Sequence, residues 1–256
     1  MKLKEKLWNW GHLEGSHNEC AKLDCDMTPE AFAEEYGIPN AFIVSYGGNI
    51  QPPFDGFAER FSGLREIKWS VLGDSSTPLP AHELGNTEDI LAVAAGSNIT
   101  GGIVDDFFAP ERLEKFPPAV LKKIRERLNA EGLDFWAVLY EHQLGMDISE
   151  YLDCFDGVTF WIWNRESLPE MDALVKRFGA LVSGKKKMLG IYLWDYPGVR
   201  PMDTALFQRQ IETYFGRLRE KSVDGVIFCS GAIGDAKLET NRILKEAVKK
   251  YGELEV

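Results

Sequence analysis

The chain alternates short, continuous apolar runs with longer segments in which apolar residues recur every three or four positions. The runs are rich in aromatic and β-branched residues and lack polar alternation, which is typical of strands covered on both faces in a parallel sheet. We expect eight such strands, at residues 7–11, 41–46, 66–72, 100–106, 134–140, 157–163, 188–194 and 225–229.

The segments between these runs predict helices. Residues 117–131 place Leu121, Ile124 and Leu128 on one face with charged residues opposite, and Gly132 ends the pattern. Similar patterns predict long helices at 169–182, 203–220 and 236–251, and shorter ones at 28–36, 54–61, 86–95 and 148–152.

Strands that alternate with helices along 256 residues match the count and size of a (β/α)8 TIM barrel. We therefore expect an α/β protein whose residues 1–256 form one barrel domain. A doubly wound open sheet is the alternative. It is disfavoured because no G-x-G-x-x-G turn follows the first strand, and because polar residues gather at nearly every strand end.

Charge narrows the possible partners. The net charge is -11 and the pI is about 5.0, which argues against a nucleic acid or an anionic membrane, since phosphates are met by clustered Lys and Arg. The one basic run, at 185–187, is interpreted as a solvated loop. No stretch has the ~20 apolar residues of a membrane helix, and no signal-peptide core is present. We expect a soluble, cytoplasmic protein, and the sequence does not indicate an oligomeric state.

Cysteines and histidines give no cofactor motif. The chain has four cysteines, too few for a disulfide scaffold, and Cys20 and Cys25 lack the spacing of a zinc knuckle or a redox C-x-x-C. Four histidines occur in total, without an H-x-H or H-E-x-x-H pattern. We therefore expect no metal and no cofactor.

Aromatic and acidic residues dominate the predicted strand ends, where a (β/α)8 barrel builds its active site. Flat aromatic rings can cover the C–H faces of a sugar, while carboxylates bind hydroxyls and transfer protons. The candidate catalytic residues are Asp105, Asp106, Glu141 and Asp195. The candidate substrate-binding residues are His12, His17, Tyr46, Tyr140, His142, Trp161, Trp163, Asn164, Tyr192 and Trp194. The expected ligand is a small carbohydrate or glycoside.

Asp105 and Asp106 close the fourth predicted strand. Two adjacent carboxylates raise each other's cost of ionisation, so the pair indicates a chemical site. Strand side chains alternate between faces, and both groups can reach one ligand only if the strand kinks or ends there. The competing interpretation has one buried Asp that orients a loop and one exposed Asp that caps the turn.

The pair resembles the adjacent carboxylates at the end of strand four in β-N-acetylglucosaminidases that use substrate-assisted catalysis. This resemblance implies that Asp105 orients a 2-acetamido group and that Asp106 protonates the leaving oxygen. Most of the chain also resembles glycosidase-like barrels without an assigned activity, which carry Val-Asp-Asp-Phe-Phe, Val-Leu-Tyr-Glu-His-Gln, Phe-Trp-Ile-Trp and Leu-Trp-Asp-Tyr at these strand ends.

The sequence departs from the common retaining glycosidase pattern, which resembles Asn-Glu after strand four and Glu after strand seven. Asp106 and Asp195 stand in those places. A two-carboxylate mechanism is the alternative, with Asp106 or Glu141 as acid/base and Asp195 as its partner.

We therefore expect a glycoside hydrolase. Two other functions stay open at this point. One is a divalent-metal-dependent sugar isomerase, epimerase or lyase that uses the same carboxylates with His12 or His17. The other is a carbohydrate-binding barrel without catalysis.

Overall fold

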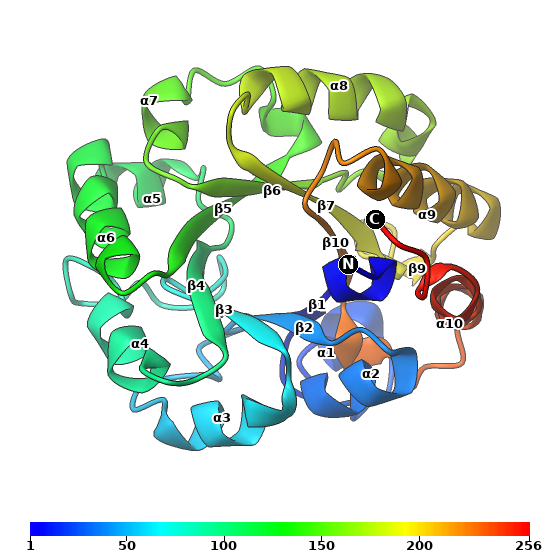
Figure 1. Cartoon of the computed structure of the whole chain (residues 1–256), viewed down its shortest axis with the longest axis horizontal. Helices are drawn as coiled ribbons and strands as arrows, with labels where there is room; N and C mark the ends of the chain where they lie inside the picture. Colours follow the sequence, from blue (N-terminus) through cyan, green and yellow to red (C-terminus); the bar gives the residue numbers. More distant parts are fainter.

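Eight parallel strands close into a barrel in the computed structural model, which describes residues 1–256 (Figure 1). Around the barrel the order is β1, β2, β3, β4, β5, β6, β7 and β10, after which β10 pairs with β1. The strands are β1 (Leu7–Gly11), β2 (Asn40–Ile43), β3 (Glu66–Ser70), β4 (Ile99–Val104), β5 (Asp134–Tyr140), β6 (Gly157–Trp161), β7 (Lys186–Tyr192) and β10 (Gly225–Cys229). The closed ring confirms the (β/α)8 barrel and excludes the open sheet.

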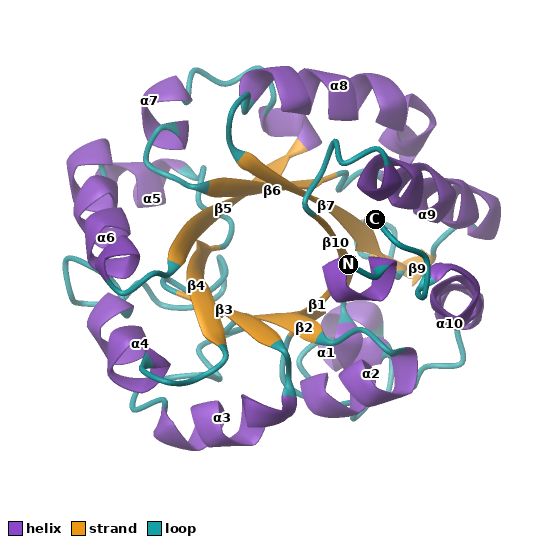
Figure 2. Cartoon of the chain, in the orientation of Figure 1, coloured by secondary structure: helices purple, strands orange, loops and turns teal.

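Helices surround the strands on the outside (Figure 2). They are α1 (Asn18–Ala21), α2 (Pro29–Tyr36), α3 (Asp55–Arg60), α4 (Thr87–Ala94), α5 (Pro110–Lys115), α6 (Pro118–Ala130), α7 (Ser149–Leu152), α8 (Met171–Leu181), α9 (Thr204–Arg219) and α10 (Glu239–Tyr251). Short 3-10 turns are η1 (Leu3–Lys6), η2 (Phe61–Gly63), η3 (Glu141–Gln143), η4 (Arg165–Glu170) and η5 (Gly231–Ile233). None of the helices combines the length and hydrophobicity needed to cross a bilayer.

The predicted helices are all present, and their ends agree with the sequence within a few residues. The strands are confirmed too, but five of them end earlier than expected, at residues 43, 70, 104, 161 and 192. Apolar residues that follow four of these ends are nevertheless buried in the loops, namely Val44, Val71, Leu72, Ile162 and Leu193. A prediction based on apolar residues alone therefore makes a strand too long when the loop after it is equally buried.

A small antiparallel hairpin follows β7 and was not predicted. Its strands are β8 (Trp194–Asp195) and β9 (Arg200–Pro201), with Asp195 paired to Arg200. Two-residue strands carry too little periodicity to be recognised in a sequence. The hairpin tip brings Tyr196 to the barrel mouth.

Aromatic side chains fill the inside of the barrel. The buried Lys68 ammonium lies 5.5 Å from the ring centroid of Trp8 and 5.3 Å from that of Trp136. Burial lowers the pKa of Lys68 to about 8, although the Asp134 carboxylate opposes this. One layer nearer the mouth, Trp10 packs edge-on against Trp161, with centroids 5.1 Å apart. Packed aromatic side chains therefore close the barrel below its mouth.

Gly190 leaves the space that Trp161 occupies. A Cβ on Gly190 would lie 2.1 Å from the Trp161 ring. We expect Gly190→Ala to lower the free energy of unfolding by about 1–3 kcal/mol, because the indole must move out of a packed layer. Gly179→Ala in α8 is the matched control, since a Cβ there meets nothing within 4 Å and alanine favours a helix. Equal urea midpoints for the two variants would contradict this packing.

Candidate active site

A cavity of about 570 Å³ opens at the carboxyl ends of the barrel strands, a volume in the usual range for small-molecule sites. The predicted site residues that line it are His12, His17, Tyr46, Asp105, Asp106, Tyr140, His142, Trp161, Trp163 and Tyr192. Glu141, Asn164, Trp194 and Asp195 are not among the lining residues. The structure therefore brings most of the predicted residues together and leaves two of the four candidate carboxylates out.

Both members of the acidic pair line the cavity. Asp105 continues the inward face of β4, two residues after Ile103. The strand itself ends at Val104, and Asp106 takes a left-handed backbone conformation with φ of 46°. Because the chain turns there, alternation no longer separates the two side chains. The Asp106 amide also donates a 2.9 Å hydrogen bond to Oδ1 of Asp105.

The environment of Asp105 favours its protonated form. Its side chain is 5 % exposed, and burial raises its pKa well above the usual value, with further increases from the carboxylates of Asp106 and Asp74. The Arg112 guanidinium acts in the opposite direction but more weakly. No protein group bonds to Oδ2 of Asp105, so this oxygen is free to meet a ligand in the cavity.

Asp106 is held as a hydrogen-bond acceptor. Its Oδ2 accepts from the Ser75 amide at 3.1 Å, and its Oδ1 accepts from the Tyr140 hydroxyl at 2.7 Å. Burial raises the pKa of Tyr140 well above its usual value, helped by Tyr192 and the two carboxylates, so the phenol stays a donor. Hydrogen bonds of this kind favour a charged carboxylate. The environment of Asp105 therefore suits a proton donor and the contacts of Asp106 suit an acceptor, the reverse of what the resemblance implies.

Asp74 adds a third carboxyl group to the cavity wall. It lies in the loop after β3, is buried, and accepts hydrogen bonds from the hydroxyls of Ser76 at 2.7 Å and Thr77 at 2.7 Å. The sequence prediction did not select it among the site residues. Its signal was the polar Asp-Ser-Ser-Thr segment directly after the third apolar run.

Arg112 of α5 fixes the loops that carry these carboxylates. The guanidinium is buried and donates to the backbone carbonyls of Gly73 at 3.0 Å and Asp105 at 2.9 Å, and also to that of Asp74. All its recorded hydrogen bonds go to backbone oxygens, and Arg112 does not line the cavity. It therefore acts as a clamp behind the loops after β3 and β4.

His12 and His17 form the opposite part of the lining, with ring centroids 4.5 Å apart. Burial lowers the pKa of His12 to about 4, although the carboxylates of Asp74 and Asp106 and the Val44 carbonyl oppose this. Burial and the neighbouring His12 also lower the pKa of His17 well below its usual value. Both imidazoles are therefore neutral near pH 7.

A hydrogen bond to a backbone carbonyl indicates the tautomer of His12. His12 Nδ1 lies 3.3 Å from the Val44 carbonyl oxygen, which can only accept, so Nδ1 carries the hydrogen and Nε2 keeps its lone pair. His17 Nδ1 lies 2.6 Å from the Tyr196 hydroxyl. The free Nε2 of His12 is thus able to accept a proton.

Aromatic rings form the remaining walls. Trp163 lies parallel to Tyr196 with centroids 6.2 Å apart, and edge-on to Tyr192 at 5.4 Å. Tyr140 stacks on His142 at 5.5 Å. These rings give the cavity several flat apolar faces next to its carboxyl groups.

Glu141 positions a cavity residue without lining the cavity. Its buried carboxylate accepts from the backbone amides of Trp163 at 2.9 Å and Asn164 at 3.1 Å, and from the Asn164 side chain at 2.7 Å. Both oxygens are used in these bonds. Glu141 and Asn164 therefore hold the loop after β6 and orient Trp163.

Asp195 has a comparable role in the hairpin. Its buried carboxylate accepts from Arg200 Nε at 2.7 Å and from the Gly198 amide at 3.0 Å. Trp194 is buried beside it, outside the cavity. These contacts do not support Asp195 as the catalytic partner of Asp106, because its oxygens are committed to the turn that carries Tyr196.

Other lining residues were not selected from the sequence. They are Trp10, Cys20, Asp74, Ser75, Phe108, Ala109, Gln143, Tyr196 and Cys229. Trp10 and Cys229 stand at the ends of predicted strands in the sequence, but neither was chosen as a candidate. Tyr196 gave no such signal, because its place depends on the unpredicted hairpin.

The donor groups do not match a metal centre. No group of three or more His, Cys, Asp or Glu side chains is arranged to hold a metal ion. The residues proposed for the metal-dependent alternative are divided between the cavity and the loops behind it, as Glu141 and Asp195 show. That alternative therefore gains no support from the arrangement of its proposed ligands.

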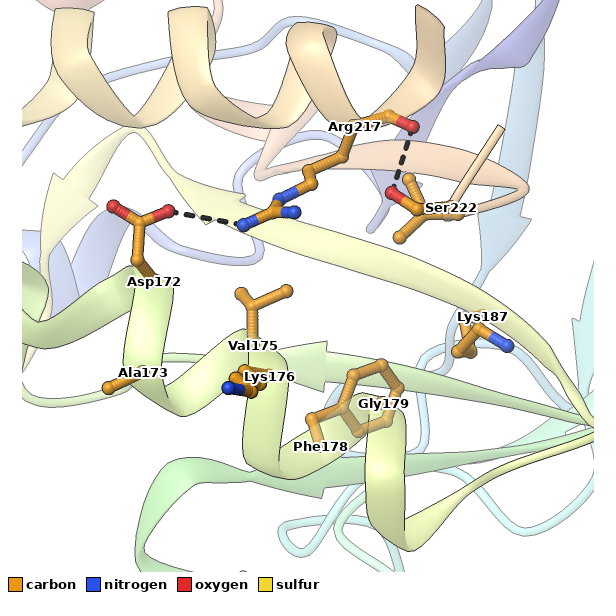
Figure 3. A pocket seen from close by; sticks show the side chains of 10 residues that line it. Asp172, Ala173, Val175, Lys176, Phe178, Gly179, Lys187, Arg217 and Ser222 are labelled. Carbon is orange, nitrogen blue, oxygen red and sulfur yellow. Dashed lines mark hydrogen bonds and ion pairs between the residues drawn. The ribbon is translucent and has the colours of Figure 1, made fainter. Parts of the chain in front are cut away.

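A second hollow, of about 620 Å³, lies on the outside of the barrel between α8 and α9 (Figure 3). Asp172 and Arg217 face each other across it at 3.4 Å, above the apolar side chains of Val175 and Phe178. Its charged side chains are already paired or point to solvent. The barrel mouth is therefore the better candidate for a chemical site.

No protein-family model matches the chain, and no curated protein matches its sequence. Its fold is similar to that of the spore cortex-lytic enzyme SleL of Bacillus megaterium QM B1551, with a TM-score of 0.57, 12% identity, and coverage of 96% of this chain and 74% of that chain. It is also similar to the glycoside hydrolase domain of PgaB (BpsB) from Bordetella bronchiseptica, with a TM-score of 0.51, 12% identity, and coverage of 89% of this chain and 93% of that chain. A chain of a tryptophan synthase complex from Pyrococcus furiosus matches with a TM-score of 0.54 and 14% identity, and the match covers 98% of this chain and 99% of that chain. At these identities the similarity concerns the fold alone.

Proposed function

We propose that the chain is a glycoside hydrolase whose general acid is Asp105. One observation carries this proposal: two adjacent carboxyl groups in one cavity differ in environment, because burial raises the pKa of Asp105 while Asp106 accepts hydrogen bonds from Ser75 and Tyr140. A buried carboxyl group with a raised pKa is typical of a catalytic acid. Two barrels of similar fold, a cortex-lytic enzyme and a glycoside hydrolase domain, agree with this reaction class.

The acid acts on the leaving group. The free Oδ2 of Asp105 donates its proton to the glycosidic oxygen as the bond to the anomeric carbon breaks. Positive charge then develops on the sugar ring. The Asp106 side chain, fixed by its hydrogen bonds from Ser75 and Tyr140, stabilises that charge without having to reorganise.

His12 is the group that completes hydrolysis in this proposal. Its neutral Nε2 accepts a proton from the attacking water while the water oxygen bonds to the anomeric carbon. Solvent then carries that proton from His12 back to Asp105, so the enzyme returns to its first state. β1 and β4 are three positions apart in the ring of eight strands, which supports a base and an acid that approach the substrate from different sides.

The aromatic walls supply binding. Trp163, Tyr192 and Tyr196 present ring faces and edges to the cavity. Such faces bind the C–H surface of a sugar through apolar contact, while the Tyr hydroxyls and His nitrogens bond to its hydroxyls.

A panel of nitrophenyl glycosides tests the proposal. The panel should contain neutral hexosides, hexosaminides and N-acetylhexosaminides, each with α and β linkages. We expect release of nitrophenol from at least one member, together with binding of the matching monosaccharide in calorimetry. Binding of a monosaccharide without turnover of any glycoside would overturn the enzyme and favour a carbohydrate-binding barrel.

A further inference from the structure

The lining of the cavity contains Asp residues and no Lys or Arg. Asp74, Asp105 and Asp106 supply its acidic groups. The buried histidines, His12 and His17, are neutral near pH 7 because burial lowers the pKa of each. A ligand in this cavity therefore meets three carboxyl groups and no Lys or Arg side chain.

The one cation close to these carboxyl groups is turned away from the ligand. Arg112 donates to the backbone carbonyls of Gly73, Asp74 and Asp105 from behind the loops. It offers the cavity no donor of its own. The carboxyl groups raise the cost of one another's ionisation in a buried site, and a bound cation would relieve that cost.

Two features of the wall suit an ammonium group. The free Oδ2 of Asp105 belongs to a side chain that is 5 % exposed and opens into the cavity, so it requires a polar partner from the ligand. The rings of Tyr46, Tyr140 and Trp163 lie in the same lining, and aromatic faces attract cations. A glycoside of an amino sugar would satisfy both features, because its glycosidic oxygen can accept from Oδ2 of Asp105 while its ammonium lies near the aromatic faces and the other two carboxyl groups.

We propose that the cavity is specific for a sugar with a free amine, so that the substrate of the hydrolase is a glycoside of an unacetylated hexosamine. The proposal rests on the proposed function in taking the ligand to be a sugar. The ammonium lies between the carboxylates of Asp74 and Asp106, and the apolar face of the ring lies against the aromatic wall. A uronic acid or a sugar phosphate is rejected, because its negative charge would face these carboxyl groups without a Lys or Arg partner.

The test compares four monosaccharides by calorimetry, at low salt and below the pKa of the amine: glucosamine, glucose, N-acetylglucosamine and glucuronate. We expect glucosamine to bind at least about tenfold more tightly than glucose or N-acetylglucosamine, as one charge-assisted contact predicts. Glucuronate should give no measurable heat. The preference for glucosamine should weaken as salt is raised.

Variants locate the contact. Asp74→Asn should reduce the affinity for glucosamine about tenfold and leave that for glucose nearly unchanged. Asp153→Asn is the matched control, because this carboxylate is 80% exposed and lies outside the cavity. If Asp74→Asn does not fold, the salt dependence of the wild-type protein tests the same contact.

The outcomes separate the two proposals. Equal affinities for glucosamine and glucose, with turnover of a neutral glycoside, would overturn the amine specificity and leave the hydrolase in place. Tight glucosamine binding without turnover of any glycoside would overturn the hydrolase and support the ligand class. Turnover of hexosaminides well above that of the N-acetylated analogues supports both.

Discussion

Replacing Asp105 with Asn is expected to lower kcat on a responsive glycoside by about 10²–10⁴-fold, the usual contribution of a general acid. Asn keeps the size of the side chain and the acceptor for the Asp106 amide, but it cannot donate a proton to the leaving oxygen. Because the sugar still contacts the aromatic wall, KM should change much less than kcat. Initial rates over a range of substrate concentrations separate the two parameters.

The same variant should not be less stable near pH 7. Burial raises the folded-state pKa of Asp105 above its unfolded value, so the stability associated with this group is present below the unfolded pKa and is lost as pH rises through the folded pKa. Asn has no charge to bury and avoids that loss. Urea unfolding at neutral pH should therefore give Asp105→Asn a midpoint equal to or above that of the wild type.

The pH profile distinguishes Asp105 from its neighbour. In the wild type, kcat/KM should fall as pH rises through the raised pKa of Asp105, because the free enzyme loses its acid. Asp106→Asn removes a negative charge that raises this pKa, so the fall should move to lower pH. A loss of turnover in Asp106→Asn with normal activity in Asp105→Asn would reverse the roles and favour those implied by the glucosaminidase resemblance.

The barrel could be predicted because it depends on a repeated local signal. Each buried strand, such as β5 or β10, is a continuous apolar run, and each long helix, such as α6, has an apolar stripe. The exact strand ends could not be predicted in the same way. Val71 and Leu72 are as apolar as the residues of β3 but lie in the loop after it, where they are equally buried.

The site was predictable only as far as its position in the fold. Asp105, Glu141 and Asp195 all follow apolar runs, and nothing local distinguishes a carboxylate that faces a ligand from one that binds a loop. That difference depends on partners distant in the sequence, such as the amide of Trp163 for Glu141. The position of Asp74 depends on a contact of the same kind, because the backbone amide of the adjacent Ser75 donates a hydrogen bond to the Asp106 carboxylate.

Arg112 is the residue whose loss should damage the fold most. Arg112→Met keeps a long side chain in α5 but leaves the carbonyls of Gly73, Asp74 and Asp105 without their charged donor. Buried groups that lose such a partner are costly, so we expect the free energy of unfolding to fall by about 3–5 kcal/mol. Urea unfolding followed by tryptophan fluorescence measures this change.

Arg127→Met in α6 is the matched control, because Arg127 makes an exposed ion pair with Glu88 on the surface and such pairs contribute little. A second measurement connects the clamp to the site. The Arg112 guanidinium lowers the pKa of Asp105, so any Arg112→Met protein that folds should lose activity at a higher pH than the wild type. If both Arg variants unfold at the wild-type midpoint and share its pH profile, the loops after β3 and β4 do not depend on this clamp. We expect a large loss of stability in Arg112→Met alone, and a fall of its kcat/KM at a higher pH than in the wild type. Both results follow if one buried cation fixes the backbone of the site and also lowers the pKa of its acid.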